Sequence, residues 1–423
     1  MFSPFISVLA GLASLSMLAS TAAAYGAGFT GSKVLSGYYP SYSMQPADVA
    51  YSKYTHLDYF VFTTTSDPAA ISQAGISDAQ IVDFVTRAHA AGVTTSYTVG
   101  GWTGSAYFST HVATAESRAI FARALVAVMQ QYNFDGIDID WEYPGSEGQA
   151  GNVVSPNDAA NFLLFLQTLR NLAGVDARLS IAVSVAGIRG ADGNVLTDMS
   201  GFAAVLDYIT LMTYDITGTW SGFTGPNAPL YSTCAPASNQ LSIDSAVRLY
   251  TAAGFVANHI IIGIPYYSYA YYVTTLTQKT CPDGTTTTMY QYATSGTTCG
   301  TYIGNAGQYT YKQLVENGWF VSQSRFRRLY DKLSQTWVLF NNVNNLFIPT
   351  ETPTTAVVKG RYAFQRRLAG VTVFDVSGDT TDSALTNGLR TGLRLDYGAQ
   401  AAAKRMAKRH LDQRRSAARS LIH

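Results

Sequence analysis

Apolar runs alternate with helical patterns along most of the 423-residue chain. Eight runs rich in β-branched and aromatic residues predict strands, and the stretches between them carry apolar residues at spacings of three and four, as amphipathic helices do. Eight strands separated by helices predict an α/β fold, a (β/α)8 TIM barrel with its active site at the carboxyl ends of the strands. The predicted strands are 34–39, 57–62, 94–99, 136–141, 179–185, 208–212, 259–265 and 371–376, and the predicted helices include 78–91, 115–132, 158–173, 243–253 and 352–368.

The connection that leads into the last predicted strand is too long for one loop and one helix. It is rich in Tyr, Thr and Gly, and residues 280–301 carry almost no charge. We therefore predict a small α+β domain at 268–350, inserted between strands seven and eight. It divides the barrel into 25–267 and 351–395 and is expected to raise one wall of a groove.

The two ends of the chain differ in composition from the rest. The apolar stretch from Ile6 to Ser20 ends in small residues that suit a signal peptidase, so residues 1–24 are predicted to be a signal peptide of a secreted, extracellular protein. The stretch is too short to favour a membrane anchor, and no later segment looks long enough to span a bilayer. The other end, 396–423, is a basic tail.

Composition predicts a folded protein with a large core, since 47% of the residues are hydrophobic and 13% are charged. The formal net charge is +1, but residues 399–423 hold seven basic side chains and one acidic side chain, which leaves the rest of the chain at −5. The tail is either a solvated, partly helical appendage, or a segment that is processed or holds the protein to an anionic cell surface.

Three cysteines allow at most one internal disulfide and leave an odd thiol. Sequence does not fix which two pair. We expect the local pairing of Cys281 with Cys299, which would close a Thr- and Gly-rich loop.

The segment 135–144 places three carboxylates at every second position of an apolar run. In a strand, Asp138, Asp140 and Glu142 share one face, while Ile137 and the other apolar residues share the opposite face. Neighbouring carboxylates about 6.6 Å apart disfavour each other's ionisation, so at least one is expected to have a raised pKa and to act as a general acid. The alternative is a half-buried strand with a solvated acidic face.

Nothing in the sequence indicates a cofactor. The six histidines do not cluster at metal-binding spacing, there is no phosphate-binding glycine loop, and isoleucines fill the places where a calcium loop needs glycine and polar residues. We expect no metal, no nucleotide and no nucleic-acid partner.

The acidic segment DGIDIDWEYP resembles the DxxDxDxE signature of glycoside hydrolase family 18, the chitinases and their relatives. Four further elements resemble motifs of the family in the correct order, and the resemblance extends from residue 34 to about 387, with spacers like those of the secreted fungal branch. These elements are 98–102 (TVGGW, similar to SxGG), 212–215 (MTYD, similar to MxYD), 263–267 (GIPYY) and 373–379 (VFDVSGD).

The resemblance implies a substrate-assisted retaining mechanism, an exception to the usual two-carboxylate scheme. Glu142 would protonate the glycosidic oxygen while the 2-acetamido group of the substrate attacks the anomeric carbon. Asp140 would bind the acetamido N–H, and Asp138 would share a proton with Asp140. Tyr214 would donate to the acetamido oxygen, with Asp215 beside it.

The substrate implied by the resemblance is chitin or chitooligosaccharide, bound by a monomer. Aromatic faces pack against the apolar face of a pyranose ring, and glycines at strand ends let backbone approach the sugar. The candidate substrate-binding residues are Tyr38, Phe62, Gly100, Gly101, Trp102, Tyr143, Met212, Trp220, Tyr266 and Phe374.

Two positions depart from the pattern of the family. Phe374 stands where Trp is usual and offers less area, and Thr98 stands where Ser is usual. Two alternatives to a chitinase stay open: an endo-β-N-acetylglucosaminidase acting on N-glycans, and a non-catalytic chitin-binding lectin. Phe374 favours the lectin alternative, whereas the presence of Glu142, Asp140 and Tyr214 argues against it.

Overall fold

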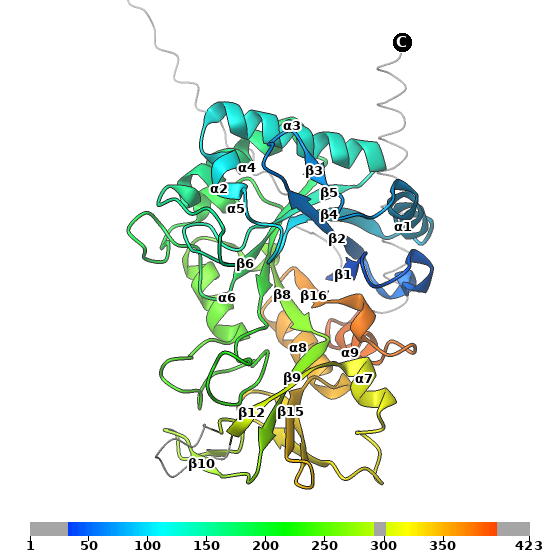
Figure 1. Ribbon diagram of the computed structural model, residues 1–423, viewed down its shortest axis with the longest axis vertical. Helices are drawn as coiled ribbons and strands as arrows, with labels where there is room; N and C mark the ends of the chain where they lie inside the picture. The colour runs from blue at the N-terminus through cyan, green and yellow to red at the C-terminus, as the bar shows by residue number, and fades with distance from the viewer. Residues whose placement is uncertain (1–32, 292–301, 396–423) are drawn as a thin grey trace, which may run out of the picture.

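A computed structural model describes residues 33–291 and 302–395. The predicted signal peptide at 1–24, the basic tail at 396–423 and Cys299 lie outside the described residues. Figure 1 shows a barrel with helices around it, and a second, smaller sheet at one end of the molecule.

Eight parallel strands close into a barrel, because the last strand, β16, pairs with the first, β1. A short strand, β3 (Ile71–Ser72), adds to β2 in antiparallel orientation. The predicted TIM barrel is confirmed, and each predicted strand overlaps one strand of the barrel. In order around the barrel these are β1 (Val34–Pro40), β2 (His56–Thr64), β4 (Thr94–Gly100), β5 (Gly136–Asp140), β6 (Arg178–Ser184), β7 (Tyr208–Met212), β8 (Ile260–Pro265) and β16 (Gly370–Phe374).

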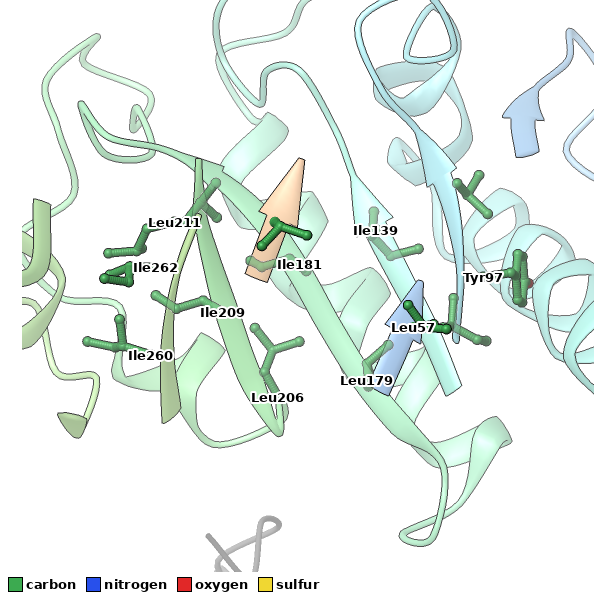
Figure 2. Close-up of a cluster of buried hydrophobic side chains, with 14 of the residues drawn as sticks. Leu57, Tyr97, Ile139, Leu179, Ile181, Leu206, Ile209, Leu211, Ile260 and Ile262 are labelled. Atoms are coloured by element: carbon green, nitrogen blue, oxygen red, sulfur yellow. The ribbon is translucent and has the colours of Figure 1, made fainter. Parts of the chain in front are cut away.

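The alternation along the strands separates an apolar outer face from a polar interior. Figure 2 shows part of the apolar set, in which side chains such as Leu57, Ile139 and Ile262 are fully buried. The intervening residues point inward, so that Asp138 lies inside the barrel beside Ser180. Burying the apolar face stabilises the barrel, and the inner face is left for polar groups.

The helices lie around the barrel, and several begin at side-chain caps. Ser77, Thr114, Ser242 and Thr352 each accept a hydrogen bond from a backbone N–H in the first turn, as N-cap residues do. The connections around β1, β2 and β6 are irregular: η1 (Pro46–Asp48) and η2 (Tyr51–Lys53) are single turns, and α5 (Ser200–Ala203) is four residues long. The helices are α1 (Asp78–Ala90), α2 (Phe108–Val112), α3 (Ala115–Tyr132), α4 (Asp158–Ala173), α6 (Ile243–Ala252), α8 (Pro353–Gln365) and α9 (Ala384–Gly392), and η3 (Ala257–His259) and η4 (Val376–Gly378) are further turns.

The chain between β8 and α8 forms an antiparallel sheet in the order β12-β9-β15-β14-β13. Its own apolar cluster includes Tyr271, Val338 and Phe347. The division of the chain at 268 and 350 remains a prediction. The elements of this region are β9 (Tyr267–Val273), β10 (Lys279–Thr280), β11 (Thr286–Thr287), β12 (Tyr302–Thr310), α7 (Tyr311–Glu316), β13 (Arg327–Asp331), β14 (Thr336–Asn341) and β15 (Leu346–Thr350).

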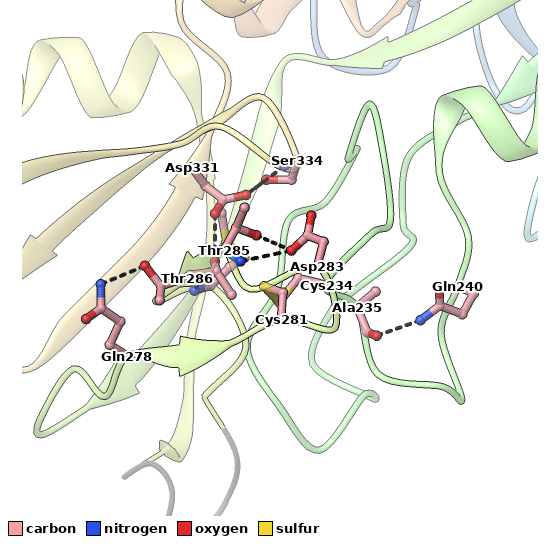
Figure 3. The surroundings of a disulfide bond; sticks show 12 residues. Cys234, Ala235, Gln240, Gln278, Cys281, Asp283, Thr285, Thr286, Asp331 and Ser334 are labelled. Atoms are coloured by element: carbon pink, nitrogen blue, oxygen red, sulfur yellow. Dashed lines mark hydrogen bonds between the residues drawn. A yellow bond between two sulfur atoms is a disulfide. The ribbon is translucent and has the colours of Figure 1, made fainter.

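A disulfide joins Cys234 to Cys281, with Cα atoms 5.2 Å apart (Figure 3). The predicted pairing of Cys281 with Cys299 is therefore wrong. That prediction preferred the nearer cysteine in sequence, but the β7–α6 loop folds against the second sheet, and Cys234 is buried there beside Phe223. The bond ties a loop of the barrel to the inserted region.

Removing this disulfide is expected to destabilise the protein. The two cysteines are 47 residues apart, and the chain-entropy estimate for a loop of this length is about 4 kcal/mol. The double variant Cys234→Ser/Cys281→Ser should therefore unfold at a clearly lower denaturant midpoint than wild type. Cys299→Ser keeps the bond and is the control, and equal midpoints for all three proteins would contradict the prediction.

Candidate active site

Asp138 lies inside the barrel on β5 and is 1% exposed. Its carboxylate accepts hydrogen bonds from Ser180 at 2.6 Å, Thr98 at 3.1 Å and Tyr38 at 3.2 Å. Burial, followed by the charge of Asp58, raises the pKa of Asp138 to about 7, although the three donors oppose the rise. Three hydrogen bonds thus fix the position of the Asp138 carboxyl group, which can carry a proton near neutral pH.

Asp140 lies one pleat further along β5 and is 5% exposed. Its Oδ1 atom has no hydrogen-bond partner among the described residues. Burial, then the charges of Glu142 and Asp138, raise the pKa of Asp140 well above its usual range. A buried polar atom without a partner is costly, so Oδ1 is an acceptor left open for a donor from outside the protein.

Glu142 follows the end of β5 and keeps some access to solvent. Its backbone is held on both sides: the N–H donates to Ser105 Oγ at 3.0 Å, and the carbonyl accepts from Asn152 Nδ2 at 3.1 Å. Burial raises the pKa of Glu142 to about 7; a hydrogen bond from Tyr143 lowers it, and the charge of Asp215 raises it. The carboxyl group therefore has the pKa that a general acid needs near neutral pH.

The prediction that the three carboxylates lie on one face of the strand agrees with the geometry. Trp141 points the other way, into the core against Phe108 and Phe162. Asp135, at the start of this segment, accepts hydrogen bonds from the His89 ring and the Thr95 backbone and so braces the strand. Sequence reasoning missed Ser105 and Asn152, because polar residues in loops carry no signal that assigns them to one backbone group.

Tyr214 and Asp215 follow β7. The ring of Tyr214 is buried and lies 5.6 Å from the ring of Phe374 at an angle of 29°. Burial, then the charges of Asp140, Asp215 and Glu142, keep the pKa of Tyr214 well above its usual value, so its hydroxyl stays protonated as a donor. Tyr214 therefore offers a hydrogen-bond donor close to three carboxylates.

Asp215 has a left-handed backbone, with φ of 57°, and its N–H donates to Asn227 Oδ1 at 2.6 Å. Its carboxylate Oδ1 accepts from Tyr267 at 2.5 Å and from Tyr269 at 2.8 Å. Desolvation of the carboxylate raises the pKa of Asp215 and the two tyrosine hydroxyls lower it, although the residue as a whole is exposed to solvent. Asn227 and the two tyrosines were not among the predicted residues.

Aromatic rings pack together at the carboxyl-terminal ends of the barrel strands. The ring of Tyr38 lies 5.7 Å from Phe60 and 5.6 Å from Phe374, and Phe60 lies 5.3 Å from Phe374. Met212 is buried near Tyr214. Phe374 thus lies between the rings of β1, β2 and β7 at the end of β16.

Two predicted substrate-binding residues do not face the interior of the barrel. Phe62 is fully buried on the outer side of β2, against Tyr59, Tyr97 and Phe134. The β2–β4 pairing shifts register between Tyr59 and Phe62, and such a shift moves a side chain to the other face of a strand. The prediction for Phe62 is wrong, and Phe60 occupies the inner position.

Tyr266 is 1% exposed and its hydroxyl contacts Thr386 of α9. It shares the outer face with Ile262 and Ile264, which strict alternation along β8 indicates. The prediction for Tyr266 is therefore wrong, and Tyr267 is the residue that points toward Tyr214.

Gly100 and Gly101 allow the end of β4 to lie close to the end of β5. A Cβ at Gly100, whose φ is +116°, would lie 2.1 Å from the Asp140 carbonyl oxygen, and a Cβ at Gly101 would lie 3.1 Å from the ring of Phe60. The Gly101 N–H donates to the same Asp140 carbonyl at 2.8 Å. The space beside Gly100 is thus filled by protein, and both residues fix the end of β5.

Exposed aromatic side chains lie at the ends of barrel strands. Trp102, after β4, is 51% exposed, and Trp220, after β7, is 60% exposed. A cavity lies between the β5–α4 and β6–α5 loops, next to the end of β5, and Trp102, Tyr143, Ser184 and Arg189 contribute to its walls. An exposed indole beside a cavity, such as that of Trp102, is typical of sites that bind sugar rings.

The four carboxylates have no basic hydrogen-bond partner within residues 33–291 and 302–395. In the same ranges no group of three His, Cys, Asp or Glu side chains is placed to hold a metal ion. No helix of the described chain is long and apolar enough to cross a membrane. The carboxylates thus form an acidic cluster whose side-chain hydrogen-bond donors are hydroxyl groups.

The chain resembles known proteins over most of its length. The family model for glycosyl hydrolases family 18 matches residues 34–379. The chain is 32% identical over 403 residues to a chitinase-like effector of Moniliophthora roreri, covering 90% of this chain and 98% of that protein. It is 30% identical over 311 residues to chitinase A1 of Niallia circulans, covering 71% and 42% of the two chains. A crystal structure of a Rhizomucor miehei chitinase matches with a TM-score of 0.73 at 27% identity, over 86% of this chain and 100% of that one.

Proposed function

Because the chain belongs to glycosyl hydrolases family 18, we propose that it is an extracellular chitinase that cleaves β-1,4 linkages between N-acetylglucosamine units with help from the substrate. The open, buried Oδ1 atom of Asp140, beside the protonatable Glu142 and the donor Tyr214, carries the proposal. An acetamido group has one N–H and one carbonyl oxygen, and the site offers one acceptor and one donor for them.

Glu142 delivers its proton to the glycosidic oxygen as the bond to the anomeric carbon breaks. The acetamido carbonyl oxygen attacks that carbon and forms an oxazolinium ion, so no protein nucleophile is needed. Asp140 accepts the acetamido N–H and stabilises the positive charge that develops. Glu142, now ionised, takes a proton from the water molecule that attacks the anomeric carbon and opens the oxazolinium ring. This proton restores the acid.

The neighbouring groups set up this chemistry. Asp138, held by its three hydroxyl donors, exchanges a proton with Asp140 and allows Asp140 to turn toward the substrate. Tyr214 orients the acetamido oxygen, and Asp215 adds negative charge beside Glu142. Trp102 and Trp220 offer faces on which further sugar rings stack.

A second candidate function is a chitin-binding lectin. The Moniliophthora roreri relative is named a chitinase-like effector, and Phe374 gives the floor of the site a smaller ring than the Trp of the family. Release of fluorophore from a chitooligosaccharide substrate decides between the two functions. Turnover supports the chitinase, and a folded protein that binds chitohexaose without cleaving it supports the lectin.

The ionisation of Glu142, the proposed general acid, sets the pH dependence of hydrolysis. Glu142 must carry its proton to act, and its pKa is raised to about 7, so the protonated fraction falls about tenfold for each pH unit above that value. We expect kcat/KM to decline on the alkaline side from about pH 7. A kcat/KM that stays constant to pH 9 on a soluble chitooligosaccharide would contradict the assignment of the acid.

A further inference from the structure

The inserted region reaches the active site through its first strand. β8 of the barrel continues almost directly into β9 of the second sheet, as Figure 1 shows. Tyr267 and Tyr269 lie on the same face of β9, and both hydroxyl groups donate to Oδ1 of Asp215. The carboxylate of Asp215 is thus held by two neutral donors from one strand.

The two tyrosines have different surroundings. The ring of Tyr267 packs on the barrel, 6.4 Å from Tyr214 and 6.4 Å from Phe374. The ring of Tyr269 lies 5.8 Å from Tyr267 and 5.3 Å from the ring of Trp220, in both cases edge to face. Tyr269 therefore joins a highly exposed indole on the β7–α6 loop to the carboxylate of Asp215.

The charged and titratable groups around Asp215 are Glu142, Tyr143 and Tyr214 of the barrel and the two tyrosines of β9. None of these groups is a cation. The two hydroxyl groups lower the pKa of Asp215 against the effect of burial, and the charge of Asp215 in turn raises the pKa of Glu142. Losing one hydroxyl group leaves the Asp215 carboxylate with a single donor.

We propose that Tyr269 is a positioning residue that holds the Asp215 carboxylate beside Glu142 and couples it to a sugar ring stacked on Trp220. The inference rests on the proposed chitinase function. Tyr269 touches neither the reacting bond nor the acetamido group. It acts through Asp215, and a sugar that fixes the indole of Trp220 also fixes the ring of Tyr269.

The test is Tyr269→Phe, which removes the hydroxyl group and keeps the ring against Trp220. Loss of one hydrogen bond to a charged group is expected to lower kcat about tenfold with little change in KM. The loss of this donor changes the field of the Asp215 carboxylate at Glu142, whose pKa depends on the charge of Asp215, so the alkaline limb of kcat/KM moves. A merely structural role would not move this limb.

Tyr272→Phe, at an exposed position of the same strand, is the matched control and should keep the wild-type profile. Trp220→Ala tests the coupling. With chitohexaose as substrate, Tyr269→Phe should lower kcat by a smaller factor in the Trp220→Ala background than in wild type. An unmoved alkaline limb overturns the positioning role, and strictly additive effects overturn the coupling. Either result leaves the chitinase function standing when wild type hydrolyses the substrate, whereas an inactive, folded wild type overturns both.

Discussion

Glu142→Gln is expected to lower kcat by about 10²–10⁴-fold and to leave the affinity for chitohexaose almost unchanged. The amide has nearly the same size and the same backbone contacts to Ser105 and Asn152, but it has no proton to give to the leaving oxygen. Turnover of a fluorogenic chitooligosaccharide and calorimetric binding of chitohexaose measure the two quantities separately.

Glu116→Gln, in the exposed first turn of α3, is the matched control and should hydrolyse like wild type. A Glu142→Gln protein with wild-type turnover would remove Glu142 from the mechanism. Loss of binding together with turnover would instead point to a folding defect, which thermal unfolding of the variant detects.

Asp140→Asn is expected to have the second largest effect, a loss of about 10²–10³-fold in kcat. The substitution keeps the volume of the side chain, but it removes the negative charge that faces the developing positive charge. It also places a neutral amide where the open Oδ1 atom accepts the acetamido N–H. Steady-state kinetics should show the loss mainly in kcat, because the interaction strengthens as the reaction proceeds.

Asp192→Asn, in an exposed loop, matches this substitution in chemistry and should be neutral. A kcat for Asp140→Asn within twofold of wild type would show that Asp140 does not contact the reacting sugar. The alkaline limb offers a second measurement: removing the charge of Asp140 also removes a neighbour that titrates together with Glu142, so the limb of the variant should shift.

Much of the fold follows from the sequence because the barrel strands obey simple alternation. In β5, the apolar Ile137 and Ile139 face the helices and Asp138 and Asp140 face the interior, as period-2 geometry requires. The main helices were predictable for the same reason, since their apolar stripes and cap residues lie at the expected spacing.

The residues that were predicted wrongly show where local patterns fail. Phe62 lies beyond a register shift in the β2–β4 pairing, which a single sequence does not reveal. Tyr266 was chosen for its place in a motif, although alternation with Ile262 and Ile264 indicates the outer face. Alternation applied strictly would have selected Tyr267.

Contacts between distant segments were not predictable at all. Cys234 pairs with Cys281 because the β7–α6 loop packs on the second sheet, and the hydroxyl of Tyr269 reaches Asp215 across 54 residues of sequence. Both contacts depend on how the inserted region docks on the barrel. Its Tyr- and Thr-rich composition describes the region but says nothing about that docking.

The anomeric form of the first product tests the central claim most directly. The acetamido oxygen attacks the anomeric carbon from the face opposite the leaving group, and water then attacks from the face that the leaving group occupied, so two inversions retain the configuration at that carbon. Proton NMR during the first minutes of chitohexaose cleavage should therefore show new reducing ends as the β-anomer, which later converts to the equilibrium mixture. The α-anomer as the first product, or no cleavage by the folded protein, would contradict the account.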